Sequence, residues 1–203
     1  MTRRLEFLAD FASPNAYLAY RALPALISRT GAGLVVTPVL LGGVFKATSN
    51  RPPFVAFAEV KGKIAYEMLE IRRFIAKHGL DKFKLNPHFP VNSLLLMRGL
   101  VAAQARGEGD VYLEMGMRGM WEEGLKLDDP ETLTRHMASA GLDAQALMEA
   151  AQLPETKQRL SEETDRAVER GVFGIPTFFV GEEMFFGKDR LGQVEDELLK
   201  SPA

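Results

Sequence analysis

The sequence contains no cysteine at all. That absence excludes disulfide bonds, thiolate zinc sites and any thiol–disulfide chemistry performed by the protein's own side chains. Any sulfur chemistry must therefore use a thiol that the protein binds. Histidine is also scarce, since the only three are His78, His88 and His136. They are scattered without metal-ligand spacing, so we expect no metal site, and His136 is expected to be solvated on a charged helix.

The sequence has neither a large excess of acidic or basic residues nor a long apolar run. The net charge is −2, from 27 acidic and 25 basic residues, which gives no electrostatic case for nucleic acid or an anionic membrane as a partner. No apolar run approaches the roughly 20 residues that span a bilayer. The segment Met1 to Leu5 does not have the pattern of a signal peptide, so a cytoplasmic protein is expected.

What is present is a normal globular composition. The 203 residues are 46% hydrophobic, which fits one large domain or one domain with a sizeable insertion. Near the N-terminus, alternating residues predict a strand at Leu5–Phe11, a helix at Asn15–Arg29 and a second strand at Leu34–Leu40. Strand, helix and strand in this order form a βαβ unit.

Helices dominate the middle of the chain, and a second group of strands follows. Capping residues and glycine stops predict helices at about Phe54–His78, from Asn92 or Ser93 to Arg106, and at Asp110–Glu123, Asp129–Ala140, Asp143–Gln152 and Glu155–Arg170. Strands at Thr177–Val180 and Met184–Phe186 precede a last helix. We therefore expect an α/β fold in which a helical insertion, 45–170, separates the two parts of a sheet domain, 1–44 and 171–203.

Ser13 and Pro14 should begin the first helix. Serine is a favoured N-cap and proline a favoured first helical residue. The free N–H groups and the macrodipole at such a helix end favour an anion. Two roles are therefore open for Ser13, a helix cap alone or a cap that also contacts an anionic ligand.

Two further segments carry groups that could bind a ligand. In the loop after the second strand, Lys46 and Arg51 could hold a carboxylate, together with Asn50 and the rigid backbone at Pro52, or the loop could simply be solvated. At the start of the last helix, Gly187-Lys188-Asp189-Arg190 could hold a carboxylate and, through Asp189, an ammonium group. The alternative is that Asp189 only caps the helix.

Four motifs in order resemble those of a known family. They are Asp10–Ala19, with its Asp-Phe-x-Ser-Pro and Tyr-Leu, Leu40–Asn50, Asn86–Asn92, and Gly171–Val180 followed by Phe186–Leu191. Together they resemble the 2-hydroxychromene-2-carboxylate isomerases, relatives of kappa-class glutathione transferases within the DsbA-like thioredoxin superfamily. The resemblance covers nearly the whole chain.

The resemblance implies a DsbA-like thioredoxin domain with a large all-helical insertion, a bound glutathione and a homodimer. Ser13 would donate a hydrogen bond to the glutathione sulfur, and the backbone of Ile175, beside a cis Pro176, would pair with the tripeptide. The positions implied for the γ-glutamyl end are Gly187, Lys188, Asp189 and Arg190. The positions implied for the acceptor substrate are Lys46, Asn50, Arg51 and Pro52.

Two loop positions and one motif depart from the family pattern. Ser49 replaces the usual glycine, Arg51 replaces a small residue or proline, and Phe186-Gly187-Lys188-Asp189 stands where Trp-Gly-Gln-Asp is common. These changes agree with glutathione binding but leave the acceptor open.

The implied chemistry is isomerisation with a borrowed nucleophile. A free thiol has a pKa of about 8.5, which a helix N-terminus or a nearby cation lowers. The glutathione thiolate would add to the conjugated carbon of an aromatic alkylidene pyruvate, the new single bond would rotate, and elimination would return glutathione. The expected reaction converts 2-hydroxychromene-2-carboxylate to trans-o-hydroxybenzylidenepyruvate in aromatic hydrocarbon catabolism, such as naphthalene degradation. A kappa-like transferase or peroxidase, and a non-catalytic module that binds glutathione or peptides, remain the alternatives.

Overall fold

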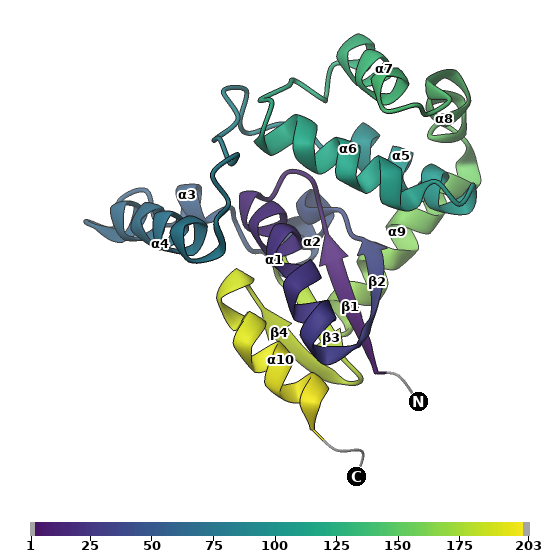
Figure 1. The fold of residues 1–203 in the computed structure, drawn as a ribbon. Coiled ribbons are helices and arrows are strands. Elements are labelled where there is room, and N and C mark those ends of the chain that lie inside the picture. The colour runs from purple at the N-terminus through teal and green to yellow at the C-terminus, as the bar shows by residue number, and fades with distance from the viewer. Residues whose placement is uncertain (1–2, 201–203) are drawn as a thin grey trace.

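A computed structural model describes residues 3–200 and has a mixed four-stranded sheet at its centre (Figure 1). The strands are β1 (Arg4–Ala9), β2 (Gly33–Pro38), β3 (Thr177–Val180) and β4 (Glu183–Phe186), in the order β2-β1-β3-β4. β1 is parallel to β2 and antiparallel to β3, which is antiparallel to β4. The predicted α/β fold with a βαβ unit and a C-terminal hairpin is confirmed.

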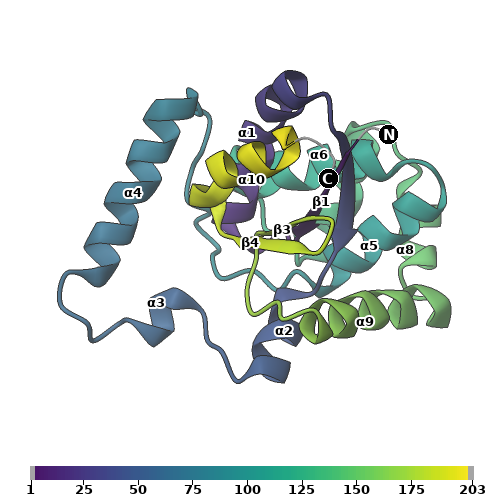
Figure 2. The same ribbon diagram turned by 90° about the horizontal axis from the view of Figure 1, so that it is seen from below.

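Ten α-helices and one short 3₁₀ helix are found in the described residues. They are α1 (Pro14–Thr30), α2 (Leu41–Thr48), α3 (Pro53–Ala56), α4 (Lys63–His78), α5 (Leu94–Ala105), α6 (Gly109–Trp121), α7 (Pro130–Ser139), α8 (Ala144–Ala150), α9 (Pro154–Glu169), η1 (Lys188–Arg190) and α10 (Leu191–Leu199). α1 and α10 lie on one side of the sheet, and α9 lies on the other (Figure 2). None of these helices is long and apolar enough to cross a membrane.

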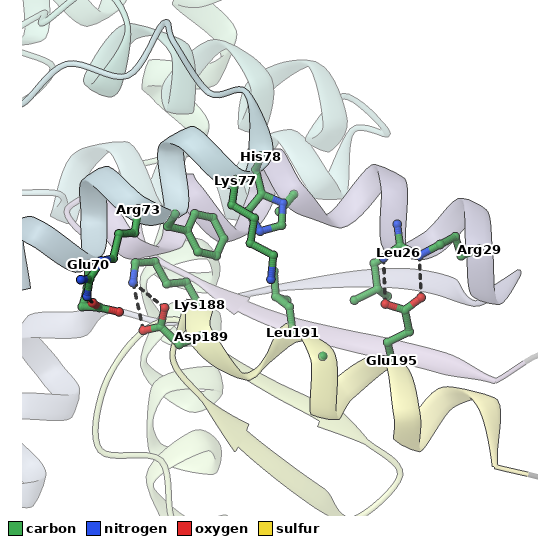
Figure 3. A pocket seen from close by; sticks show the side chains of 13 residues that line it. Leu26, Arg29, Glu70, Arg73, Lys77, His78, Lys188, Asp189, Leu191 and Glu195 are labelled. Carbon is green, nitrogen blue, oxygen red and sulfur yellow. Dashed lines mark hydrogen bonds and ion pairs between the residues drawn. The ribbon is translucent and has the colours of Figure 1, made fainter.

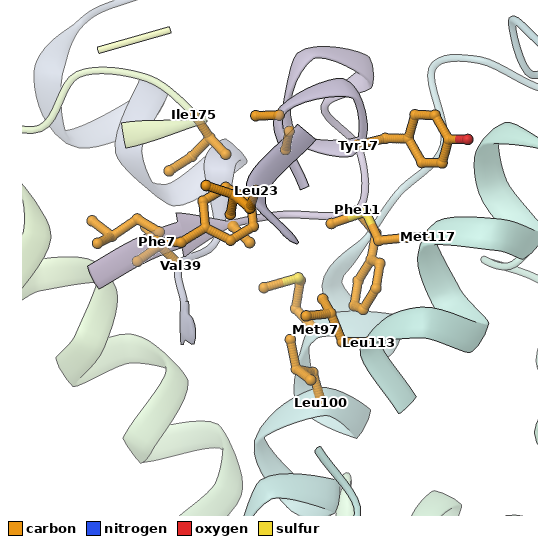
Figure 4. Packing of buried hydrophobic residues seen from close by; sticks show 14 of the residues in the cluster. Phe7, Phe11, Tyr17, Leu23, Val39, Met97, Leu100, Leu113, Met117 and Ile175 are labelled. Atoms are coloured by element: carbon orange, nitrogen blue, oxygen red, sulfur yellow. The ribbon is translucent and has the colours of Figure 1, made fainter. Parts of the chain in front are cut away.

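The hydrophobic core runs from the sheet into the helices without a break. Phe7 of β1 and Phe178 of β3 stack with their ring centroids 5.4 Å apart. Phe11, at the end of the same β1 segment, lies close to Met97 and Met117 from the helical part (Figure 4). Because buried residues of both parts form one cluster, the core does not by itself mark a boundary. The division into 1–44 with 171–203 and 45–170 stays a prediction.

Local capping signals were reliable guides to several helices. Ser13, Asp129 and Asp143 each accept a hydrogen bond from the backbone N–H three residues later, as expected of N-caps. Trp121 is fully buried and donates from Nε1 to the carbonyl of Phe11 at 2.9 Å. The three methionines of α6 are also buried.

Two expected helix boundaries were wrong. The predicted helix Phe54–His78 is two helices, α3 and α4, because Gly62 adopts a left-handed φ of 83° immediately before α4. Asp110 does not cap α6, which begins one residue earlier, at Gly109, with Glu108 in the cap position. The break in the first case leaves α3 and α4 as an arm that projects from the body (Figure 2).

The arm formed by α3 and α4 exposes much apolar surface. Within the two helices, only Phe74 is buried. Five large apolar residues of this arm and its connecting turn have exposed fractions between 38% and 52%. They are Phe54, Val55, Phe57, Val60 and Tyr66. An apolar surface of this kind is characteristic of a surface that contacts another protein.

Gly116 provides a test of the junction between α6 and the strand end. A Cβ at this position would lie 2.4 Å from the ring of Phe11, which is fully buried. We expect Gly116→Ala to destabilise the fold by about 1–3 kcal/mol, because an overpacked core forces side chains from their rotamers. Gly42→Ala is the control, since a Cβ there meets nothing within 4 Å. Urea unfolding should show Gly42→Ala within about 1 kcal/mol of the wild type; equal effects of the two substitutions would contradict this packing.

Candidate functional site

Ser13 lies at the mouth of α1, where its side chain is held by two hydrogen bonds. Its Oγ accepts from the N–H of Ala16 at 3.1 Å and donates to the carbonyl of Ile175 at 3.0 Å. Only 4% of the residue is exposed. Because Oγ–H has one proton, its donor capacity is taken up by Ile175 in this structure. Ser13 is therefore both a helix cap and a link to a segment 162 residues away in the sequence.

The segment around Ile175 and Pro176 connects this helix mouth to the last helix. The Ile175–Pro176 peptide bond is cis, as the resemblance implied. The carbonyl of Pro176 accepts from the N–H of Gly187 at 2.9 Å. Gly187 has φ 94°, a conformation that favours glycine. Three of the segments predicted to bind glutathione therefore meet at Ser13, Ile175–Pro176 and Gly187.

An exposed aromatic pair borders these groups. The rings of Phe173 and Phe186 lie 4.6 Å apart, and 40% and 43% of the two residues are exposed. Between them in the chain, Gly174 leaves room for the Phe186 ring, since a Cβ on Gly174 would come within 2.8 Å of it. The pair forms apolar surface next to the cis-proline segment.

Asn50 brings the predicted acceptor loop to the same place. Its Nδ2 donates to the carbonyl of Phe173 at 2.8 Å, and its Oδ1 accepts from the N–H of Arg51 at 2.8 Å. Pro52 occupies the cap position of α3. Ser49, where the family pattern has glycine, has φ 57° and is the only non-glycine residue with a positive φ within residues 3–200. The glycine preference of the family therefore has a backbone reason that the serine here tolerates.

Lys46 is placed in a different environment. The prediction that it lies in a loop was wrong, because the chain forms the helix α2 from Leu41 to Thr48. Lys46 is exposed on α2 and lines a cavity that α2 forms with α5 and α9. Its ammonium group makes no hydrogen bond or ion pair with any residue of the described chain. No contact between Lys46 and Ser13 is found in residues 3–200, so the expected proximity of Lys46 to a bound thiol stays a prediction.

Two of the four predicted γ-glutamyl positions, Lys188 and Asp189, border a cavity of about 430 Å³ between α1, α4 and the start of α10, whereas Gly187 and Arg190 do not line it (Figure 3). Lys188, only 4% exposed, donates from Nζ to both carboxylate oxygens of Asp189 at 2.7 and 2.9 Å. The same Nζ lies 5.2 Å from the centroid of the Phe74 ring. At the far end, Arg29 and Glu195 form a bidentate ion pair at 2.6 and 2.8 Å.

Asp189 is therefore not a simple helix cap. Gly187 occupies the cap position of η1 and no side chain provides a capping hydrogen bond, so the alternative of Asp189 as N-cap was wrong. The Asp189 carboxylate instead binds an ammonium group, which is the kind of partner predicted for it, although here the partner is Lys188. Arg190 is exposed and stands immediately before α10.

Asp10 was missed by the sequence reasoning as a functional position. It is fully buried, and its two carboxylate oxygens accept from the N–H of Ala12 at 2.8 Å and of Leu41 at 2.7 Å. The Ser93 side chain also hydrogen-bonds it. Burial raises the pKa of the Asp10 carboxyl, against the opposing effect of these three hydrogen bonds. An acidic residue between a strand and a capping serine was the signal available in the sequence.

The three histidines are not brought together in this site, although His78 lines the cavity between α1, α4 and α10. His136 is buried rather than solvated, with its Nε2 3.0 Å from the carbonyl of Met115, because α7 packs against α6. Its expected exposure was wrong because the charged residues of α7 face away from this contact. Within residues 3–200 no group of three or more His, Asp or Glu side chains is placed to hold a metal ion.

Comparison with known proteins relates this geometry to one family. The sequence model of the DSBA-like thioredoxin domain matches residues 4–199. The chain is 31% identical, over 98% of its length and 100% of the relative's, to 2-hydroxychromene-2-carboxylate isomerase of Sphingobium xenophagum. It is 26% identical, over 94% of its length and 88% of the relative's, to glutathione S-transferase kappa 1 of Homo sapiens.

A solved structure agrees with these sequence comparisons. The fold superposes on a structure of 2-hydroxychromene-2-carboxylate isomerase with a TM-score of 0.80 and 29% identity. The match covers 95% of this chain and 93% of the other. Fold and sequence therefore point to the same group of relatives.

The buried carboxyl of Asp10 predicts a distinctive pH dependence. Because the folded state binds the Asp10 proton more tightly than the unfolded state, stability from this group is present below about pH 3.8 and is lost as the pH rises through the raised pKa. Asp10→Asn removes this titration. In urea unfolding at a series of pH values, the wild-type free energy of unfolding minus that of Asp10→Asn should therefore fall as the pH rises.

Ser93→Ala is the matched control for this experiment. It removes a partner of the carboxyl but leaves the carboxyl itself, so it should retain the wild-type direction of the pH dependence. A difference between the wild type and Asp10→Asn that is flat or rises with pH would contradict the assignment.

Proposed function

The chain belongs to the family of DSBA-like thioredoxin domains, and from this premise we propose that it is a glutathione-dependent isomerase. The proposed reaction is the conversion of 2-hydroxychromene-2-carboxylate, or a related aromatic alkylidene pyruvate precursor, to trans-o-hydroxybenzylidenepyruvate. Its relatives named as this isomerase and as kappa-class transferases support the proposal. The lack of cysteine supports it too, since the reactive thiol must then be bound.

The hydrogen bond between Ser13 and Ile175 is the observation that carries this proposal. It joins the hydroxyl that would contact the glutathione sulfur to the carbonyl that would pair with the peptide. A bound peptide thiol offers both an acceptor and an N–H donor, so it can replace both ends of this bond. The hydroxyl of Ser13 then turns to the sulfur, while the Ile175 carbonyl accepts from the ligand's backbone.

The surroundings of Ser13 also fit a bound thiolate. The N-terminus of α1 carries positive potential, which favours an anion and lowers the pKa of a nearby thiol. In the same first turn, Oδ1 of Asn15 is buried and has no partner in the described chain, so it is available to accept from a ligand. Bound glutathione would supply a thiolate that adds reversibly to the conjugated carbon and leaves after bond rotation, so that none is consumed.

The remaining predicted residues have roles that follow from their positions. The Asp189 carboxylate would accept from the ammonium group of the γ-glutamyl end while it remains paired with Lys188. Gly187 and Arg190 would border the carboxylate of the γ-glutamyl group. Asn50, Arg51 and Pro52 would hold the acceptor, because Asn50 ties their loop to Phe173. The exposed Phe173 and Phe186 rings would pack against its aromatic ring.

A kappa-like glutathione transferase is the second candidate, because relatives of that name match over nearly the whole chain. A transferase or peroxidase would use the same thiolate but consume it. A non-catalytic module that only binds glutathione or a peptide would turn over neither substrate. The balance of glutathione separates these functions.

We also propose a homodimer that acts in the cytoplasm in aromatic hydrocarbon catabolism, such as naphthalene degradation. The exposed apolar surface of the arm formed by α3 and α4 supports the dimer, since a second copy could cover it. Sedimentation velocity tests the dimer, and cell fractionation tests the location.

Ser13 provides the first test of this function. Ser13→Ala removes the proposed donor to sulfur, and a hydrogen bond to a charged group contributes about 1.5–3 kcal/mol, so the rate should fall about 10- to 100-fold. The thiol pKa of bound glutathione should rise, which ultraviolet absorbance of the thiolate across pH will measure. Ser13→Thr keeps the hydroxyl and should retain a lowered thiol pKa; unchanged rates in Ser13→Ala with glutathione bound would remove Ser13 from the mechanism.

The glutathione balance provides the second test. With purified protein, 2-hydroxychromene-2-carboxylate and glutathione, we expect formation of trans-o-hydroxybenzylidenepyruvate to require glutathione while the concentration of free thiol stays constant. Absorbance of the product and a thiol assay on the same samples measure both. Stoichiometric loss of thiol would instead establish a transferase, and glutathione binding without turnover would establish a binding module.

A further inference from the structure

A second cavity, of about 550 Å³, opens between α2, α5 and α9. α2 and α9 lie side by side at this place (Figure 2). The N–H of Leu40 donates to Oγ1 of Thr164 at 3.0 Å, and a Cβ on Gly43 would lie 3.0 Å from the Thr164 methyl group, so the two helices are in close contact on one side of the cavity. The cavity is thus built by three elements that the core holds in place.

Three cationic side chains, one from each helix, line this cavity. They are Lys46 of α2, Arg98 of α5 and Lys157 of α9. Within residues 3–200 none of the three makes a side-chain hydrogen bond or an ion pair. Asp165 is the only acidic residue in the lining and is likewise unpaired, so the lining carries a net charge of +2 from three cations and one anion.

The guanidinium group of Arg98 has a buried donor atom that no acceptor of the described chain satisfies. Its Nε atom is buried and has no hydrogen-bond partner among residues 3–200. A buried donor without an acceptor costs free energy, and most buried polar groups in folded proteins have partners. The other cavity differs in this respect, because Arg29 and Lys188 there are already paired with Glu195 and Asp189. The buried Nε–H of Arg98 is therefore free to donate a hydrogen bond to a ligand.

The rest of the lining is mostly apolar. Leu40, Leu94 and Leu160 contribute branched side chains, and the hydroxyl of Thr164 is already used in donating to the Leu160 carbonyl. A small inorganic anion would contact the cations but leave the leucine side chains without an apolar partner. Cations beside leucines instead match a carboxylate attached to an apolar body.

We propose that this cavity binds an aromatic or similarly apolar carboxylate, with Arg98 and Lys157 as its main charge contacts. Lys46 adds a third cation from α2. The binding itself does not require glutathione at Ser13, and neither Arg98 nor Lys157 belongs to the motifs that resemble the family. The carboxylate can come from the acceptor of the proposed reaction, through Lys46, or from a separate ligand.

The test uses trans-cinnamate, an aromatic carboxylate, in isothermal titration calorimetry with the purified full-length protein. We expect one cinnamate per chain and at least about tenfold weaker binding of cinnamamide, which has the same shape without the charge. Inorganic phosphate, a charge without an apolar body, should also bind more weakly. Equal binding of cinnamate and cinnamamide, or phosphate binding as tight as cinnamate, would overturn the proposal.

Substitutions inside and outside the cavity test whether cinnamate binds at this place. Arg98→Gln and Lys157→Gln should each weaken cinnamate binding about tenfold, whereas Arg159→Gln, a charge change on α9 outside the cavity, should leave it unchanged. Lys157 is partly exposed and has no buried atom without a partner, unlike Arg98, so its variant keeps the test valid if Arg98→Gln fails to fold. Ser13→Ala should retain cinnamate binding. Loss of binding in Ser13→Ala, or equal losses in Lys157→Gln and Arg159→Gln, would place the carboxylate elsewhere.

The source of the carboxylate is decided in the isomerase assay, which depends on the proposed function. Competitive inhibition by cinnamate against the acceptor, with the acceptor KM raised in Lys157→Gln, would identify the acceptor as the occupant. Inhibition or activation that is not competitive, and that Lys157→Gln abolishes, would identify a separate ligand. If the protein has no isomerase activity, the calorimetric test still stands, so failure of the function and failure of the site remain distinguishable.

Discussion

The buried carboxyl of Asp10 is the constraint on which the arrangement of the site depends. It stands where β1 ends, accepts the N–H of Ala12 just before the capping Ser13, and accepts the N–H of Leu41 at the first residue of α2. The Ser93 side chain, at the start of α5, also contacts it. One residue without any exposed surface therefore positions the starts of three helices relative to the sheet. Since both candidate sites lie at those starts or along those helices, a shift at Asp10 would move them together.

Much of the fold could be predicted because its signals are local. Ser13, Asp129 and Asp143 cap their helices through hydrogen bonds that span three residues, and such bonds depend only on adjacent sequence. The C-terminal hairpin was recognisable for the same reason, from short apolar runs around a turn. Among the site residues, the resemblance implied that Ser13 and Ile175 would each contact a bound tripeptide, and their hydrogen bond to each other was not predicted. The sequence alone left open whether Ser13 was more than a cap.

What could not be predicted depends on contacts between distant segments. Asp10 and Leu41 are 31 residues apart, and no periodicity connects a strand end to the start of a later helix. The burial of His136 follows from the packing of α7 on α6, which the charges of its own helix concealed. The cavity between α2, α5 and α9 brings together Lys46, Arg98 and Lys157, three cations that lie far apart in the sequence and that no local pattern connects. The pair of Lys188 with Asp189 is local, yet the burial of Lys188 against Phe74 is not.

In the proposed function, the hydrogen bond between Ser13 and Ile175 would also determine which thiols the protein can use. A ligand that draws the hydroxyl of Ser13 to its sulfur leaves the Ile175 carbonyl, in a residue only 6% exposed, without its donor. A simple alkyl thiol cannot replace that donor, and an unsatisfied buried acceptor costs about 1–3 kcal/mol. A peptide thiol restores the bond with its own amide. In the proposed function, the pair of Ser13 and Ile175 would therefore favour a peptide thiol over a simple alkyl thiol by roughly one to two orders of magnitude.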